Sequence, residues 1–62
     1  MTKLKKLLWL DTFMIPGDDN IYAFSSVRKG DKIGCNDKNH VFHYFDPNLD
    51  VIKVQMPKDW II

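Results

Sequence analysis

Apolar residues along the chain occur in short stretches that clusters of turn-forming residues separate. The clusters lie at residues 16–20, 28–31, 34–39, 46–50 and 57–59. Asn, Asp and Gly reverse a chain easily because they tolerate left-handed backbone or hydrogen-bond to their own backbone. This spacing predicts five strands, at about residues 4–15, 20–27, 31–35, 40–46 and 50–56, with linkers of hairpin length between them.

The last two segments show strand periodicity in different forms. In residues 51–56, Ile52, Val54 and Met56 alternate with Lys53 and Gln55, which predicts a half-buried strand with the apolar residues facing the core.

The segment 40–46 carries aromatic side chains on both faces. Val41, His43 and Phe45 fall on one face, whereas Phe42 and Tyr44 fall on the other. Either this strand is central in the sheet, or its second face meets something else.

The first segment fits two structures. Leu4, Leu7 and Leu8 are spaced as in one turn of an amphipathic helix, so helix over about residues 3–10 is an open alternative. The β-type residues Trp9 and Phe13 favour a strand instead.

Composition points to a single small β domain that spans residues 1–62. The chain has no Glu, and β-branched and aromatic residues dominate its apolar set. We therefore predict an all-β fold, a five-stranded antiparallel meander curled into a small SH3-like or OB-like barrel, because closure removes exposed sheet edges. Residues 27–33 resemble the Gly-Asp turn that leads into a strand in many SH3-like barrels, which is a resemblance of architecture alone.

Charge and cysteine usage exclude several classes of protein. The net charge of +1 indicates neither a nucleic-acid partner nor a membrane surface. A single Cys forms no internal disulfide, which favours a cytoplasmic location. The apolar run at residues 7–10 is shorter than the roughly 7–15 residues of a signal-peptide core, and no run approaches the about 20 residues of a membrane span.

Candidate metal and catalytic sites are weak. Cys35, His40 and His43 are zinc-type ligands, but on a strand the two histidines point to opposite faces. Residues 46–50 begin like a calcium loop, yet Val51 stands where that loop needs Gly and Pro57 where it needs Glu. Cys35 beside a histidine is the best nucleophile pair, and no cleft is expected around it. We predict no enzyme activity, no metal and no cofactor.

A surplus of large apolar residues at the chain ends predicts a protein-binding module: an adaptor, inhibitor or accessory regulator. If the first segment is a strand, Leu8, Leu10 and Met14 face the core and the opposite face is left uncovered. The expected contact residues are Leu7, Trp9, Phe13 and Trp60. The partner would be another protein or a second copy of the chain. In an alternative interpretation, Trp60 lies across the sheet as a lid and covers this face.

A second hypothesis is nucleic-acid binding, because small barrels present basic and aromatic side chains to single strands. The basic residues would be Arg28, Lys29 and Lys32. The stacking residues would come from the aromatics of the second and fourth segments, above all Tyr22 and Tyr44, with Phe24 and Phe42 beside them. The near-neutral net charge argues against this hypothesis.

Overall fold

The computed structural model describes residues 1–60, whereas Ile61 and Ile62, at the apolar C-terminal end, lie outside the described residues. Within residues 1–60 the elements, in chain order, are β1 (Thr2–Lys3), the 3-10 helix η1 (Leu4–Lys6), β2 (Thr12–Met14), β3 (Ile21–Lys29), β4 (Lys32–Asn36), β5 (Phe42–Phe45) and β6 (Asp50–Val54). The all-β prediction is confirmed, and each predicted segment after the first contains one strand.

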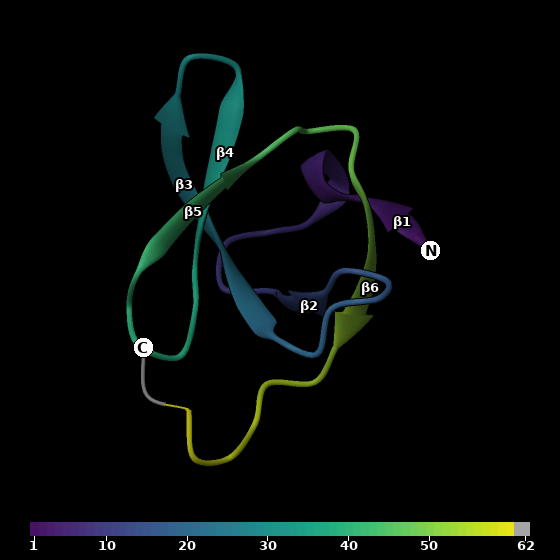
Figure 1. Cartoon of the computed structure of the whole chain (residues 1–62), viewed down its shortest axis with the longest axis vertical. Helices are drawn as coiled ribbons and strands as arrows, with labels where there is room; N and C mark the ends of the chain where they lie inside the picture. The colour runs from purple at the N-terminus through teal and green to yellow at the C-terminus, as the bar shows by residue number, and fades with distance from the viewer. Residues whose placement is uncertain (61–62) are drawn as a thin grey trace.

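The strands form one antiparallel sheet in the order β1-β6-β2-β3-β4-β5. Strands β2 to β5 pair in chain order, as in the predicted meander, and β6 returns to pair with β2. Among residues 1–60, hydrogen bonds do not close this sheet into a barrel, so β1 and β5 are its two edges. In Figure 1 the β3–β4 hairpin projects at the top, whereas residues 55–60 loop below β6.

The prediction of one strand over residues 4–15 is wrong. The Leu4 N–H donates to the Leu49 carbonyl oxygen and the Lys5 N–H to the Pro47 carbonyl oxygen, each at 2.9 Å, which ties η1 to the loop before β6. The chain then reverses at residues 8–11, where the Leu8 N–H donates to Asp11 Oδ2 at 2.8 Å. The helical alternative is correct for one turn only, and β-structure begins again at Thr12.

These turns reverse the side-chain facing expected for the first segment. Leu7 is buried, whereas Leu8, expected in the core, is 73% exposed. In β6 the facing is also the opposite of the predicted one, because Val51 is fully buried and Ile52 is exposed. Periodicity therefore located β6 correctly but chose the wrong face.

The sheet curls around one core, which comprises Leu4, Leu7, Phe13, Tyr22, Phe24, Ile33, Cys35 and Val51. Strands that are not neighbours in the sheet contribute side chains that meet there. Phe13 of β2 packs edge-on against Phe45 of β5, with ring centroids 6.4 Å apart. Since β2 and β5 are not hydrogen-bonded to each other, this contact requires the sheet to bend over its inner face.

Candidate binding surface

The structure separates the four residues predicted to contact a partner. Leu7, Phe13 and Trp60 are buried, and Phe13 has no exposed surface at all. Only Trp9 is exposed, at 68%, on the turn between η1 and β2. The four side chains therefore form no common exposed face in the described residues. The alternative, in which Trp60 lies across the sheet as a lid over this face, is not what the structure shows: Trp60 is buried beside Ile21, and Trp9 remains exposed.

The nucleic-acid set is also divided between surfaces. Lys29 and Lys32 pair directly across β3 and β4, and Lys29 Nζ lies 5.3 Å from the centre of the Tyr44 ring. Arg28 points to the opposite face, where its guanidinium lies over the Phe24 ring. Tyr22 is buried in the core. The structure thus brings together Lys29, Lys32 and Tyr44, whereas Arg28 and Tyr22 lie away from this group.

The grouped residues belong to an exposed patch on the outer face of β3, β4 and β5. Phe42 and Tyr44 are 44% and 39% exposed, and their rings stack with centroids 6.5 Å apart at 23°. A Cβ at Gly34 would lie 3.2 Å from both Tyr44 Cε1 and Val27 Cβ, so these side chains close over the glycine. We call Val27, Gly34, Phe42 and Tyr44 the outer aromatic patch.

Sequence reasoning missed Val27 and Gly34 in this patch. Gly34 belongs both to the predicted strand over 31–35 and to the turn cluster at 34–39, and it lies inside β4. A glycine opposite an aromatic residue on a neighbouring strand is a signal of close side-chain approach, but that pairing is visible only once the register Gly34↔Tyr44 is known.

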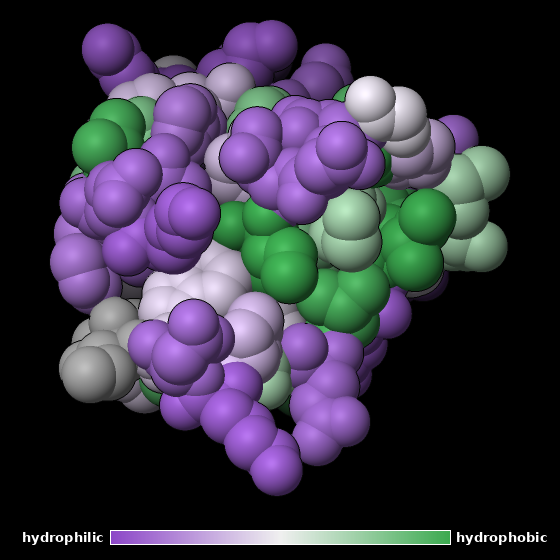
Figure 2. Space-filling model, turned by 60° about the horizontal axis from the view of Figure 1, so that its bottom comes forward, coloured by the Kyte–Doolittle hydropathy of each residue, from purple (hydrophilic) through white to green (hydrophobic). Residues whose placement is uncertain are grey.

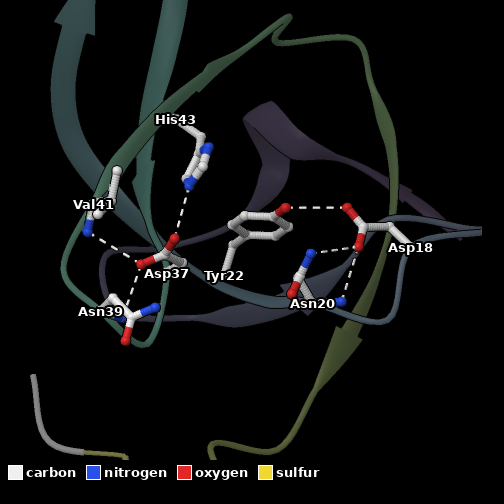
Figure 3. Close-up of polar contacts among 7 residues, drawn as sticks. All are labelled: Asp18, Asn20, Tyr22, Asp37, Asn39, Val41 and His43. Carbon is white, nitrogen blue, oxygen red and sulfur yellow. Dashed lines mark hydrogen bonds and ion pairs between the residues drawn. The ribbon is translucent and has the colours of Figure 1, made fainter.

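The inner face of β5 opens onto a polar network, shown in Figure 3. His43 Nε2 lies 2.8 Å from Asp37 Oδ2, and Asp37 Oδ1 accepts the N–H groups of Asn39 and Val41. The hydrogen bond from His43 lowers the pKa of Asp37, with help from these two backbone donors. Asp37 is thus fully occupied in holding the β4–β5 turn together.

Tyr22 connects this network to the β2–β3 loop. Its ring meets the His43 ring edge-on at 5.3 Å, and its hydroxyl donates to Asp18 Oδ2 at 3.0 Å. Burial raises the pKa of Tyr22, and the bond to Asp18 adds to this effect. The pKa of Asp18 is lowered, chiefly because it accepts the Asn20 backbone N–H. These contacts organise two turns around the core.

Cys35 and the histidines do not assemble into a metal or catalytic cluster in the described part of the chain. Cys35 is fully buried, and this burial raises the pKa of its thiol to about 12. His43 is bound to Asp37, and His40 is exposed before β5 begins. Within residues 1–60 no three His, Cys, Asp or Glu side chains are placed to hold a metal ion.

A hollow of about 390 Å³ lies between the C-terminal tail and the start of β3. Ile21, Trp60 and the carboxylates Asp19 and Asp59 are among its lining residues. Trp60 Nε1 is buried and has no hydrogen-bond partner among residues 1–60. The lining mixes acidic and apolar groups without a defined ligand geometry.

A second apolar area lies where β6, β2 and β3 run side by side. Met14 pairs with Ile52 on one side and Ile21 on the other, so these three side chains share the outer face. Figure 2 brings the lower side of the molecule forward and shows apolar side chains gathered there between polar ones. This area is aliphatic and lacks the stacked aromatic pair of the outer aromatic patch.

Comparisons with protein-family models, curated proteins and solved structures gave no match for this chain. None of the helical residues described here belongs to a segment of the length and apolarity needed to cross a membrane.

Proposed function

We propose that this protein is a small non-enzymatic binding module that docks on another protein through the outer aromatic patch. The observation that carries the proposal is the position of β5. The sequence left two explanations for aromatics on both faces of this strand: a central position, or a second face that meets something else. β5 is an edge strand of the sheet, with Phe42 and Tyr44 exposed.

The composition of the patch supports a protein interface. Aromatic side chains with restricted rotamers are enriched among the residues that dominate binding energies. Phe42 and Tyr44 are already stacked on each other, and Gly34 lets Tyr44 lie close to β4. A partner would therefore bury a preordered apolar surface and lose little side-chain entropy on binding.

Two lysines place positive charge beside the outer aromatic patch. Lys29 Nζ is held over the Tyr44 ring, and Lys32 lies directly opposite Lys29 at the end of the hairpin. A partner surface with carboxylates next to apolar groups would match this arrangement.

A nucleic-acid strand is the second candidate, favoured by the same contact of Lys29 with a stacked aromatic pair. Bases stack on exposed aromatic rings while lysines contact phosphates. The loss of Arg28 and Tyr22 from the set weakens this hypothesis, as does the net charge of +1.

We further propose that the curled sheet is a variant of the SH3-like barrel rather than the OB-like one. Four consecutive strands pair in chain order and the last strand returns to the first of them, an order typical of SH3-like barrels.

The proposal is tested by affinity capture with the tagged chain from source-cell lysate, with and without nuclease. The double variant Phe42→Ala/Tyr44→Ala is compared with Trp9→Ala, which removes a more exposed aromatic outside the patch. We expect wild type and Trp9→Ala to recover the same protein in stoichiometric amounts, and the double variant to bind it at least about 30-fold more weakly.

Two results would contradict the proposal. Recovery that disappears with nuclease would favour the nucleic-acid hypothesis, which a steep loss of oligonucleotide affinity with rising salt would then support. Equal recovery by all three proteins, with the double variant still folded, would exclude the patch as the contact.

A further inference from the structure

We propose that the open edge of β5 receives an extended acidic segment of the partner as an added β-strand, with the outer aromatic patch covering its side chains. This inference rests on the proposed function and names the kind of partner that the same surface binds. Addition of an extended peptide to a sheet edge is a common mode of recognition, in which backbone hydrogen bonds give affinity and side-chain pockets give specificity.

The register of β4 and β5 determines which backbone groups face outward. The Asp37 N–H donates to the Val41 carbonyl oxygen at 3.1 Å, so these residues form a hydrogen-bonded pair. In antiparallel sheets such pairs alternate with pairs that are not hydrogen-bonded. With the register Asn36↔Phe42, Cys35↔His43 and Gly34↔Tyr44, the bonded pair is Cys35 with His43.

Phe42 and Tyr44 therefore direct their N–H and C=O groups away from β4, toward the open edge. No strand lies beyond β5 in the sheet that residues 1–60 form. The same two residues place their side chains in the outer aromatic patch. Backbone groups and side chains thus meet an incoming strand at the same two positions.

Within its four residues, β5 carries no lysine, proline or bulge that would prevent strand addition. Proteins protect sheet edges with lysine, proline, bulges or very short strands. β5 reads Phe-His-Tyr-Phe, and its register with β4 is regular. The opposite edge is different, because β1 has two residues and its Lys3 Nζ bonds to Asp50 Oδ1 at 2.7 Å.

The charges beside the edge favour an acidic occupant over a second copy of this chain. Lys32 begins β4 beside the Ile33–Phe45 pair, Lys29 lies opposite it at the end of β3, and the carboxylate of Asp46 follows directly after β5. The Asp31 carboxylate lies in the turn between the two lysines, but within residues 1–60 neither Lys29 nor Lys32 forms an ion pair with Asp31 or Asp46, so both ammonium groups are available to a partner. A segment with Asp or Glu next to alternating apolar residues would satisfy both the charge and the patch.

The test begins with selection of random twelve-residue peptides, displayed on phage, against the folded chain. We expect enriched peptides to combine acidic residues with alternating apolar ones, and to bind Lys29→Ala/Lys32→Ala at least about fivefold more weakly. Arg28→Ala, which removes a positive charge on the other face, is the matched control and should bind as wild type does.

Amide hydrogen exchange, measured by NMR, then distinguishes binding at the β5 edge from binding to the outer aromatic patch alone. In the free chain the amides of Phe42 and Tyr44 should exchange quickly and those of His43 and Phe45 slowly, because only the latter bond to β4. A saturating selected peptide should slow exchange at Phe42 and Tyr44 at least about tenfold.

Three outcomes would overturn the inference. If a peptide requires the patch residues but leaves the amides of Phe42 and Tyr44 unprotected, the edge has no role and the proposed function stands. If no acidic peptide is enriched, the partner class is wrong. If the two amides become protected with rising concentration of the chain alone, the occupant is a second copy.

Discussion

The two faces of β5 have similar residue types and opposite surroundings. On the inner face Phe45 meets the Phe13 and Tyr22 rings, and His43 is bound to Asp37. On the outer face the Phe42 and Tyr44 rings stack, the Lys29 ammonium group lies over the Tyr44 ring, and both rings remain exposed. Residue type therefore does not decide whether an aromatic side chain belongs to the core. The curl of the sheet decides it, and it leaves the outer pair exposed.

The strongest test of this comparison replaces one aromatic residue on each side of the sheet. Phe13→Ala should cost about 3–5 kcal/mol, because it removes a fully buried ring that packs against Tyr22 and Phe45. For so small a domain this approaches the whole free energy of unfolding. Thermal denaturation followed by circular dichroism should show loss of the cooperative transition.

Tyr44→Ala is the outer-face counterpart and should cost less than about 1 kcal/mol, since its ring is already partly hydrated. If Phe13→Ala instead unfolded like wild type and lost partner binding, Phe13 would be a contact residue, as the sequence predicted.

Thiol reactivity compares the two faces of β4. At pH 8 the native Cys35 thiol should react with a disulfide reagent roughly a thousandfold more slowly than after unfolding in urea, because its pKa of about 12 leaves little thiolate and burial blocks access. The control Cys35→Ser/Lys32→Cys places the thiol at an exposed position of the same strand and should react at an ordinary rate. Fast reaction of the native wild-type protein would contradict the buried position of Cys35.

The smallest expected effect concerns acid stability at the rim of the inner face. The folded-state pKa of Asp37 lies below its ordinary value of 3.8, so its stabilising contribution is fully present well above pH 3.8 and is lost as the pH falls through the folded-state pKa. Asp37→Asn should therefore lower the melting temperature at pH 7 by a few degrees and make its decline from pH 5 to pH 3 shallower.

Asp31→Asn, at an exposed position of the β3–β4 turn, controls for the loss of one charge. If its melting temperature changed with pH in the same way as that of Asp37→Asn, the contact between Asp37 and His43 would contribute nothing specific.

Much of the fold could be predicted because turn chemistry acts locally. Gly30, at a positive φ of 61°, lies in the turn between β3 and β4 that the sequence indicated. Asp46 Oδ1 accepts the Asn48 N–H, as an Asx turn requires. Such contacts depend on residues two or three positions apart, so their pattern is visible in the sequence.

The first segment could not be predicted in the same way. The path of η1 depends on bonds from Leu4 and Lys5 to the loop that carries Leu49 and Pro47, more than forty residues later. Those bonds bury Leu4 and Leu7 and leave Leu8 and Trp9 outside. The predicted contact set assumed that strand alternation runs through residues 7–13, and the turn at residues 8–11 interrupts it.

The amino-acid sequence by itself determined an all-β chain with strands in the last four predicted segments, and an excess of aromatic residues on one of them. Periodicity and turn residues carry this information because they act over a few neighbouring positions. Tertiary structure alone decided that β5 is an edge strand, that Phe13 is core and that Tyr44 is surface. These properties follow from strand order and from the bending of the sheet, which depend on contacts between residues far apart in the chain.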